Sequence, residues 1–488
     1  AAQIRCTKTK NQLSRIYIYS FIKTDEYLEE LMNHDCFNIL KTKNVELIGY
    51  SKKVFQSSAL KSPTKFDLSE LPNELKKLKL DVPDNYADNH SITNEWAIYR
   101  WAKAIDTNDE DIETIISKVK HQLYYKYLST LYPESKIKKH TKKDLEINNS
   151  TSSNILYVDD EADRGWCEIL CKILFDYNKF HFDYLGDELK SRTKEEIISF
   201  VISEVANNDF DILILDFRLH KDDFTCDIKN VSSLNILKRI KELNFGIQVI
   251  IFSATNKVWN LQALFDAGAD GFVMKESPIN SIDEYFSNNL ISLFINTISK
   301  ANKVKFLKEL FVKFKSAKIN LYSCDYVDDT DYENFLDNLK SKLKIVEDSL
   351  KSIKKPKSTS LDITFLNCFN YLESYKNEYY LKYIDNRFTL GIEEVELDRL
   401  KPSYQRIDNK GVFIPNDKYD KPTWFHTISG LAKDYFEICE LNDGFLLNIY
   451  KIKIARDDFI HEDKKHFNVQ DLKNILEIIV EFTKNMKE

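Results

Sequence analysis

The chain has 488 residues, of which 43% are hydrophobic and 30% are charged, and its formal net charge at pH 7 is −7. This length predicts about two to four domains, and the apolar content is sufficient for buried cores. The slightly acidic balance excludes a globally basic nucleic-acid-binding protein, so any such site must be local. The first residues lack the features of a signal peptide, and no stretch of about 18 apolar residues occurs, which predicts a cytoplasmic protein without a membrane partner.

The N-terminal region, residues 1–132, predicts an α+β domain of unknown type. Two short runs rich in β-branched and aromatic residues, 15–21 and 45–49, predict strands, and residues 26–40 between them predict a helix. Residues 94–104 and 111–132 predict two further helices, because their apolar positions recur at helical spacing. The region carries no catalytic motif, so the sequence assigns it no function.

The aromatic residues of these two helices have two interpretations. Trp96, Trp101 and the pair Tyr124 and Tyr125 could form a recognition surface, but aromatic side chains at helical spacing more often pack in a core. We therefore expect core positions. Residues 133–152, rich in Lys, Ser and Asn, predict a linker to the next domain.

Four fragments in the middle of the chain predict the strands of one parallel sheet. The fragments are 155–162, 211–219, 248–254 and 267–275, and each contains a short apolar run typical of strands buried on both faces. A polar or charged residue follows each run at once. Because parallel strands place their carboxyl ends at one edge of a sheet, these polar residues are expected to converge there.

The converging residues suit phosphoryl acceptance; they are Asp159, Asp160, Asp216, Ser253 and Lys275. An aspartate can attack phosphorus and carry an acyl phosphate. Mg²⁺ prefers carboxylates together with water and phosphate oxygens, so the three aspartates could share one ion. A lysine and a hydroxyl can then bind the phosphoryl oxygens. The alternative, ordinary polar residues at strand ends, is much weaker once all four fragments occur in this order.

Residues 153–300 resemble a response-regulator receiver domain of the two-component family, which implies a flavodoxin-like (βα)5 fold. The resemblance implies phosphorylation of Asp216, Mg²⁺ as cofactor, and a histidine kinase or another phosphodonor protein as partner. The family's phosphoryl-binding and switch positions correspond to Ser253, Lys275 and Phe272, and its metal ligands correspond to Asp159, Asp160, Asp216 and the backbone carbonyl of Arg218.

This sequence departs from the receiver pattern after the third strand. No proline follows Leu219, the usual glycine that opens the third helix is absent, and residues 220–231 have the character of an insertion. The insertion could reshape access to Asp216, and with it the choice of partner and the lifetime of the phosphoryl group.

The region after the receiver predicts helices. Residues 301–355 predict a helical connector, because neither proline nor glycine occurs between Pro278 and Pro356. For the lysines of residues 303–318 we favour a solvated face over contacts with RNA phosphates. Residues 356–488 predict a mainly helical output domain with a turn-rich interruption at 391–422.

The last helix of this output domain has an apolar stripe that could pack on its neighbour or on a second subunit; the stripe is Leu472, Ile475, Ile479, Phe482 and Met486.

The segment from Arg456 to His461 carries the second resemblance. Arg456 continues an apolar helical stripe, where a guanidinium is costly unless it is paired or faces a partner. Arg456 and His461 resemble the Arg-x4–6-His signature of HEPN domains, many of which are metal-independent ribonucleases that act as dimers. The resemblance implies an endoribonuclease and homodimer with RNA as substrate, in which His461 is the general acid or base and Arg456 stabilises phosphate charge.

Two points qualify this second resemblance. A spacing of five residues turns His461 about 140° away from Arg456 on a straight helix, so the helix must end or bend near Ile460. The alternatives are a structural pair of Arg456 with Asp457 beside a surface histidine, or His466 in the role of His461.

The sequence therefore predicts a multidomain α/β plus α protein with two hypotheses for its function. The first is a response regulator, phosphorylated on Asp216, that gates a HEPN-like ribonuclease in stress or antiviral defence. The alternative is a non-enzymatic response regulator whose helical C-terminal domain mediates dimerisation or binds a protein. A DNA-binding output ranks third, because no helix-turn-helix with a basic recognition helix is found.

Overall fold

The computed structural model describes most of the chain, with gaps. The described residues are 1–7, 12–21, 24–32, 35–49, 53, 56–57, 64–78, 80, 89–131, 137–147, 152–254, 258–277, 286–324, 330–376, 380–384, 387–390, 395–396, 400–407, 410–415, 423–441, 443–461 and 466–486. The chain divides into two compact units. Unit 1 comprises Ala1–Leu237 and Val249–Ser299, and unit 2 comprises Lys238–Gln248 and Lys300–Glu488.

Unit 1 begins with a two-stranded parallel sheet. Strand β1 (Ile16–Tyr19) pairs with β2 (Val45–Ile48), which confirms the two predicted strands. The predicted helix 26–40 is present only in part, because helix α2 ends at Met32 and a 3₁₀ helix follows from Asp35. The neighbouring elements are α1 (Ala2–Cys6), α2 (Thr24–Met32), η1 (Asp35–Lys41), η2 (Leu68–Glu70) and α4 (Leu71–Leu75).

Three helices follow: α5 (Asn89–Ile105), α6 (Glu110–His121) and α7 (Leu123–Leu131). The prediction of one helix over 111–132 was wrong, because Gln122 has an extended backbone that separates α6 from α7. The turn lets the buried hydroxyl of Tyr125 donate a hydrogen bond to Glu95 of α5 over 2.6 Å. Trp96, Trp101 and Tyr125 are fully buried, so their predicted core role is confirmed.

Part of the predicted linker packs against unit 1. Residues 137–147 include the short helix α8 (Lys142–Leu145), and the side chain of Leu145 is buried. Asn288 brackets the backbone of Lys138: its Oδ1 accepts from the Lys138 nitrogen over 3.2 Å, and its Nδ2 donates to the Lys138 carbonyl over 2.6 Å. These described residues are therefore fixed to the α/β domain.

The centre of unit 1 is a five-stranded sheet in the order β4-β3-β5-β6-β7. The pairs β3–β4, β3–β5 and β6–β7 are parallel. Numbered along the domain, this is the order 2-1-3-4-5, which is consistent with the predicted flavodoxin-like (βα)5 domain. The strands are β3 (Asn154–Val158), β4 (His181–Leu185), β5 (Ile212–Leu215), β6 (Gln248–Ser253) and β7 (Gly271–Met274).

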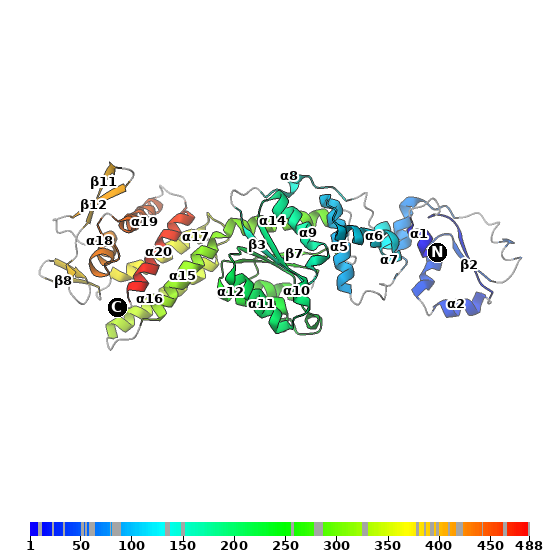
Figure 1. The fold of residues 1–488 in the computed structure, drawn as a ribbon, viewed down its shortest axis with the longest axis horizontal. Coiled ribbons are helices and arrows are strands. Elements are labelled where there is room, and N and C mark those ends of the chain that lie inside the picture. Colours follow the sequence, from blue (N-terminus) through cyan, green and yellow to red (C-terminus); the bar gives the residue numbers. More distant parts are fainter. Residues whose placement is uncertain are drawn as a thin grey trace. The chain divides into compact units, whose positions relative to one another are not determined.

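Helices cover both faces of this sheet, with α9 and α14 on one face and α11 and α12 on the other (Figure 1). Every residue of β5 and β6 is buried, which accounts for their continuous apolar sequences. The helices are α9 (Trp166–Cys171, followed by the π-helical turn η5, Lys172–Tyr177), α10 (Asp187–Lys190), α11 (Lys194–Asn207), α12 (Ser232–Leu243), α13 (Val258–Asp266) and α14 (Phe286–Val304).

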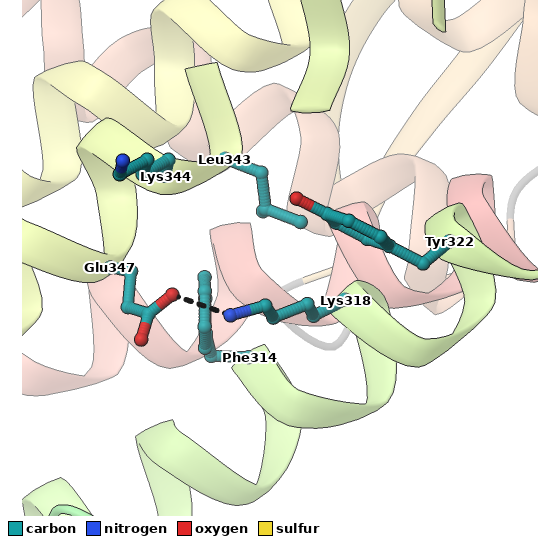
Figure 2. Close-up of a pocket in the computed structure, with 6 residues that line it drawn as sticks. All are labelled: Phe314, Lys318, Tyr322, Leu343, Lys344 and Glu347. Carbon is teal, nitrogen blue, oxygen red and sulfur yellow. Dashed lines mark hydrogen bonds and ion pairs between the residues drawn. The ribbon is translucent and has the colours of Figure 1, made fainter. Parts of the chain in front are cut away.

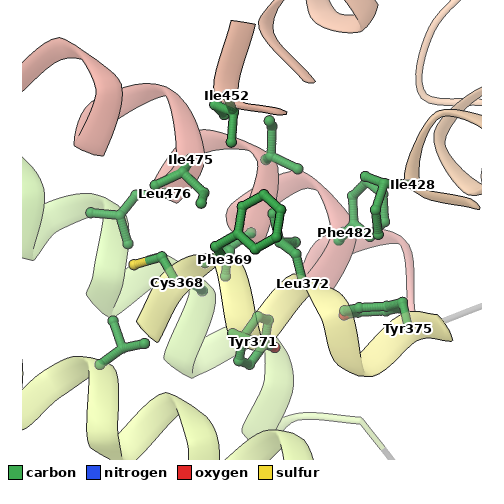
Figure 3. Close-up of a cluster of buried hydrophobic side chains, with 14 of the residues drawn as sticks. Cys368, Phe369, Tyr371, Leu372, Tyr375, Ile428, Ile452, Ile475, Leu476 and Phe482 are labelled. Atoms are coloured by element: carbon green, nitrogen blue, oxygen red, sulfur yellow. The ribbon is translucent and has the colours of Figure 1, made fainter. Parts of the chain in front are cut away.

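Unit 2 is built from helices that share one hydrophobic core. The principal helices are α15 (Phe306–Tyr322), α16 (Thr330–Lys351), α17 (Thr359–Glu373), α18 (Trp424–Gly430, followed by the π-helical turn η9, Leu431–Tyr435), α19 (Gly444–Ile460) and α20 (Val469–Asn485). One cluster of buried side chains has members from Val304 to Met486, so the predicted connector and output segments contribute to the same core. Figure 3 shows its centre, where α17 presents Phe369 and Leu372 to Phe482 of α20.

Two expectations for unit 2 can be compared with the structure. The apolar stripe of the last helix packs inside the chain itself: Leu472, Ile475, Ile479 and Phe482 are completely buried. The expectation of a turn-rich interruption at 391–422 was incomplete, because the described residues of this range are extended and paired into antiparallel strands. Around it lie η8 (Ser374–Lys376), β8 (Leu381–Ile384), β9 (Arg387–Leu390), β10 (Val395–Glu396), β11 (Leu400–Ile407) and β12 (Lys410–Pro415).

Among the helices that the structure describes, none combines the length and the apolar character needed to cross a membrane.

Candidate functional site

The carboxyl edge of the five-stranded sheet holds the polar residues that the sequence places after its strands. The sheet's backbone hydrogen bonds continue into them: the Asp216 nitrogen donates to the Val158 carbonyl over 2.9 Å, and the Lys275 nitrogen donates to the Ser253 carbonyl over 2.9 Å. These bonds fix where each side chain leaves the edge. The structure therefore brings Asp159, Asp160, Asp216, Ser253 and Lys275 to one edge, as predicted from four separate fragments.

Three carboxylates and one ammonium group form the centre of the site. Carboxylate oxygens of Asp159, Asp160 and Asp216 lie within 4.8 Å of one another. The Nζ atom of Lys275 lies 2.5 Å from Asp159 and 3.2 Å from Asp216, and all three of these side chains are buried. Burial disfavours the charged form of Lys275, but the two carboxylates outweigh it and raise its pKa, so the ammonium stays charged.

Asp159 is held by groups on three sides. Its Oδ1 accepts a hydrogen bond from the Glu161 nitrogen over 2.8 Å, and its Oδ2 accepts from Lys275 and from the hydroxyl of Tyr157. Burial, followed by the charge of Asp159, raises the pKa of Tyr157 well above its usual value, so the phenol remains a donor. The sequence analysis missed Tyr157; a tyrosine inside a strand predicted to be fully buried is the signal, because its hydroxyl needs a partner.

Two aromatic rings lie next to the ammonium group of Lys275. The Nζ atom of Lys275 lies 5.6 Å from the ring centre of Trp166 and 5.3 Å from that of Phe252, and these two rings meet edge to face. Such contacts favour a cation over the ring face. Trp166 is itself positioned by Asn94 of α5, whose side-chain oxygen accepts from the indole nitrogen over 3.1 Å.

The remaining predicted receiver positions lie around this centre. Ser253 is buried at the end of β6, and Phe272 is half-buried in β7, opposite Ile251. The backbone nitrogen of Arg218 donates to the Asp216 carboxylate over 3.2 Å, and its guanidinium lies over the ring of Phe224 at 4.6 Å.

The predicted insertion, residues 220–231, is folded into two 3₁₀ turns, η6 (Lys221–Phe224) and η7 (Ile228–Asn230). The buried carboxylate of Asp223 links the two ends of the insertion. One oxygen accepts from the backbone nitrogens of Leu219 and His220, and the other accepts from Ser232. Lys194 of α11 adds an ion pair of 2.8 Å. Asp223 therefore anchors both ends of the insertion, and it is a second residue absent from the predicted site residues.

The carboxylate cluster fits a divalent cation. Three aspartates carry three negative charges and Lys275 carries one positive charge, which leaves two negative charges for a bound ion to balance. Carboxylate oxygens are the ligands that Mg²⁺ prefers, and their mutual separation within 4.8 Å allows one ion to contact more than one of them.

The second predicted site lies on α19. This helix ends at Ile460 and His461 follows as its C-cap, so the helix end that the Arg-to-His spacing requires is present. Arg456 contacts Asp457 over 3.1 Å and lies over the ring of Phe369 at 5.2 Å, while the side chain of His461 is exposed. Among the described contacts Arg456 is thus paired with Asp457, as in the structural alternative, and not with His461.

His466, the alternative histidine, has a different environment. Its Nδ1 lies 2.8 Å from the buried carboxylate of Asp362, whose other oxygen accepts from the backbone nitrogen of Phe467. Phe467 stacks between Phe365 and Phe459. Asp362 therefore fastens the segment before α20 onto α17.

The lysines of residues 303–318 make contacts within unit 2. Lys313 pairs with Glu477, and Lys318 lies 2.7 Å from Glu347. Lys318 also lines a pocket of about 270 Å³ between α15 and α16, where the Glu347 carboxylate faces it (Figure 2). Both cations are thus engaged by carboxylates of the chain, which agrees with a solvated face better than with a phosphate-binding row.

The strand order is consistent with a flavodoxin-like α/β domain, and a cluster of carboxylates lies at the carboxyl ends of its strands. No family model and no curated protein matches the sequence. Among solved structures, a Chloroflexus aurantiacus protein described as a response regulator aligns over 29% of this chain and 99% of its own, with 19% identity and a TM-score of 0.19. The Salmonella typhimurium RcsB response regulator aligns over 44% of this chain and 98% of its own, with 14% identity and a TM-score of 0.21. Values this low do not place the chain in a family.

Proposed function

We propose that residues 153–300 form a receiver domain that accepts a phosphoryl group on Asp216. The observation that carries this proposal is the buried cluster at the sheet edge, in which Asp216 lies beside Asp159, Asp160 and the ammonium of Lys275. The partner that we propose is a phosphodonor protein such as a histidine kinase.

The transfer uses groups that the edge already holds. A carboxylate oxygen of Asp216 forms a bond to phosphorus while the bond between phosphorus and the donor atom breaks, and the electron pair leaves with the donor. Asp159, Asp160, Asp216 and the backbone carbonyl of Arg218 would hold Mg²⁺, which would neutralise charge on the phosphoryl oxygens. Lys275 and the hydroxyl of Ser253 would then bind those oxygens. Ser253 would be the first switch residue and Phe272 the second.

We further propose that the phosphoryl group gates the C-terminal output. A ligand shifts an equilibrium by its differential affinity for two states, so phosphorylation would favour the state in which Ser253 and Lys275 both reach the phosphoryl oxygens. The output in this proposal is a HEPN-like ribonuclease active as a homodimer, in stress or antiviral defence. The ribose 2′-oxygen would bond to phosphorus while the bond from phosphorus to the 5′-oxygen breaks. His461 would act as general base on the 2′-hydroxyl or as general acid on the leaving 5′-oxygen, and Arg456 would stabilise the charge on the phosphate.

One observation favours the non-enzymatic alternative. The guanidinium of Arg456 is engaged by Asp457 and by the ring of Phe369, which is itself stacked on Trp424. An arginine in this setting can serve packing alone. The C-terminal unit would then mediate dimerisation or bind a protein.

Beryllofluoride, a phosphoryl mimic, tests the receiver assignment. With Mg²⁺ it should bind the wild-type chain in calorimetry, and Asp216→Asn should abolish binding because the anionic acceptor oxygen is lost. Asp211→Asn is the matched control, since Asp211 lies at the opposite end of the same strand and its carboxylate accepts from the Asn154 nitrogen over 3.0 Å. Binding that persists in Asp216→Asn, or that is equally lost in Asp211→Asn, would contradict the assignment.

RNA cleavage separates the two output hypotheses. A ribonuclease output predicts that Arg456→Ala and His461→Ala each abolish degradation of RNA by the wild-type chain, with and without chelator. His466→Ala tests the alternative histidine, whose ring lies on Asp362: loss of cleavage in this variant and not in His461→Ala would assign the role to His466. Absence of cleavage by wild type in the beryllofluoride-bound state would favour the non-enzymatic output.

A further inference from the structure

The residue after Lys275 is anchored by two helices. The carboxylate of Glu276 is completely buried, and its Oε1 lies 2.7 Å from Nε of Arg100 on α5, which is almost as deeply buried. Its Oε2 accepts from the hydroxyl of Ser287 on α14 over 2.6 Å, and Arg100 also donates to that hydroxyl over 2.8 Å. A closed triangle of Arg100, Glu276 and Ser287 therefore holds the chain immediately beyond the phosphoryl-binding lysine.

The same helix supports the site from a second direction. Trp101, the neighbour of Arg100, packs against Trp166 and Phe252, with ring centres 5.4 Å and 5.7 Å away. These are the two rings that lie next to the ammonium of Lys275. Helix α5 thus contacts the surroundings of Lys275 in two ways. Arg100 pairs with Glu276, the next residue in the chain, and Trp101 packs on the two rings beside the ammonium group.

Close packing makes this contact specific. Gly165, which precedes α9, has a φ of 109°, and a Cβ atom there would come within 3.0 Å of Ile98 on α5. The turn before α9 therefore lies close against α5, and a side chain at residue 165 would be crowded and its backbone strained.

Stability alone is a poor reason for a buried ion pair. The free energy needed to remove two charges from water is roughly as large as the free energy gained from their attraction. Well-packed apolar residues would therefore stabilise the same contact equally well. A buried pair does fix one geometry, because each charge must keep its partner. The pair of Arg100 and Glu276 is therefore better suited to holding a position than to adding stability.

We propose that α5 is a built-in positioning element of the phosphoryl site, in which Arg100 acts through Glu276 to hold Lys275 where it meets the phosphoryl oxygens. This inference rests on the proposed receiver function. It also gives the N-terminal region a role, since the state of the site and the packing of α5 become coupled, and such coupling is reciprocal.

A double variant tests the positioning role without leaving an unpaired buried charge. Arg100→Met with Glu276→Gln removes both charges together. The matched control is Glu95→Gln with Lys118→Met, which removes an ion pair of 2.5 Å from the same helix on the side facing α6. Calorimetry would measure Mg²⁺ alone, and then beryllofluoride at saturating Mg²⁺, for all three proteins.

We expect the test variant to lose affinity for beryllofluoride and to keep its affinity for Mg²⁺. Lys275 contacts the phosphoryl oxygens and not the metal, so the test variant should bind beryllofluoride about tenfold more weakly, as when a competent state falls to about a tenth. Its Mg²⁺ affinity should stay within about twofold of wild type, and the control should match wild type for both ligands. Equal weakening in test and control, or parallel loss of both ligands in the test variant, would reduce the triangle to a structural contact and overturn the inference.

Hydrogen exchange on the wild-type chain tests the coupling without any substitution. Beryllofluoride with Mg²⁺ should slow amide exchange in residues 89–105 more than in residues 110–131, and unchanged exchange in α5 would overturn the inference. Failure of the receiver assignment has a different signature, because wild type would then bind no beryllofluoride at all.

Discussion

Asp223 shows how a single buried carboxylate can organise a loop next to a reactive site. It accepts from backbone nitrogens on both sides of the insertion and pairs with Lys194, whose side chain is only 13% exposed. Burial disfavours the charge on Lys194, but Asp223 outweighs it and raises the pKa of that lysine. The loop that carries Arg218 is thereby held beside Asp216.

Asp223→Ala should destabilise unit 1 by about 2–4 kcal/mol, because it leaves a buried cation and several backbone donors without their acceptor. Urea unfolding monitored by tryptophan fluorescence measures the loss. Asp222→Ala is the neighbouring control, since the Asp222 side chain is 65% exposed, and it should change stability little. Equal effects of the two substitutions would show that Asp223 is not the anchor.

At the scale of elements, close approach explains one glycine in unit 2. A Cβ atom on Gly246, between α12 and β6, would lie 2.3 Å from the carbonyl carbon of Leu307 at the start of α15. Backbone atoms cannot move aside as the end of a side chain can, so the two segments would have to separate.

Gly246→Ala should therefore lower the stability of unit 2 by about 1–3 kcal/mol. Gly444→Ala is the opposite case, because a Cβ there meets nothing within 4 Å and the residue begins α19. It should stabilise the unit by about 0.4–1 kcal/mol. Thermal unfolding midpoints that fall for Gly246→Ala and rise for Gly444→Ala are expected; a neutral Gly246→Ala would contradict the described contact.

The segment that joins α7 to the α/β domain should respond to acid. Burial lowers the pKa of His140, whose Nε2 lies 2.9 Å from the Asn288 amide. The unfolded chain therefore binds a proton more readily than the folded one, and stability present above about pH 6.5 is lost as the pH falls further. His140→Gln should flatten the fall in urea midpoint between about pH 7.5 and about pH 5; an unchanged slope would contradict this role.

The elements differ in how well the sequence predicts them. The central strands are apolar along their whole length because both faces are buried, so β5 and β6 and the polar residues beyond them could be located directly. Pairings between distant segments leave no such pattern: nothing local indicates that Glu276 meets Arg100 or that Trp166 donates to Asn94. The strands after α17 were missed as well, because β10 has only two residues, while β11 contains Pro402 and β12 ends at Pro415, and proline is unusual within a strand.

At the scale of the whole molecule, each compact unit has its own organisation. Unit 1 places the N-terminal helices, the segment 137–147 and the five-stranded sheet in one body around the acidic edge. Unit 2 buries residues of the predicted connector and of the predicted output in one core. In our proposal, a signal that reorganises the output would act on unit 2 as a whole, since its helices share their packing.

Covalent modification tests the central claim most directly. The full chain would be incubated with Mg²⁺ and a small acyl-phosphate donor, and the product would be mapped by peptide mass spectrometry. Our account predicts one added phosphoryl group, labile to hydroxylamine, on the peptide containing residues 211–219, and no such product in Asp216→Asn. No modification of wild type, or a modification that Asp216→Asn leaves unchanged, would contradict the account.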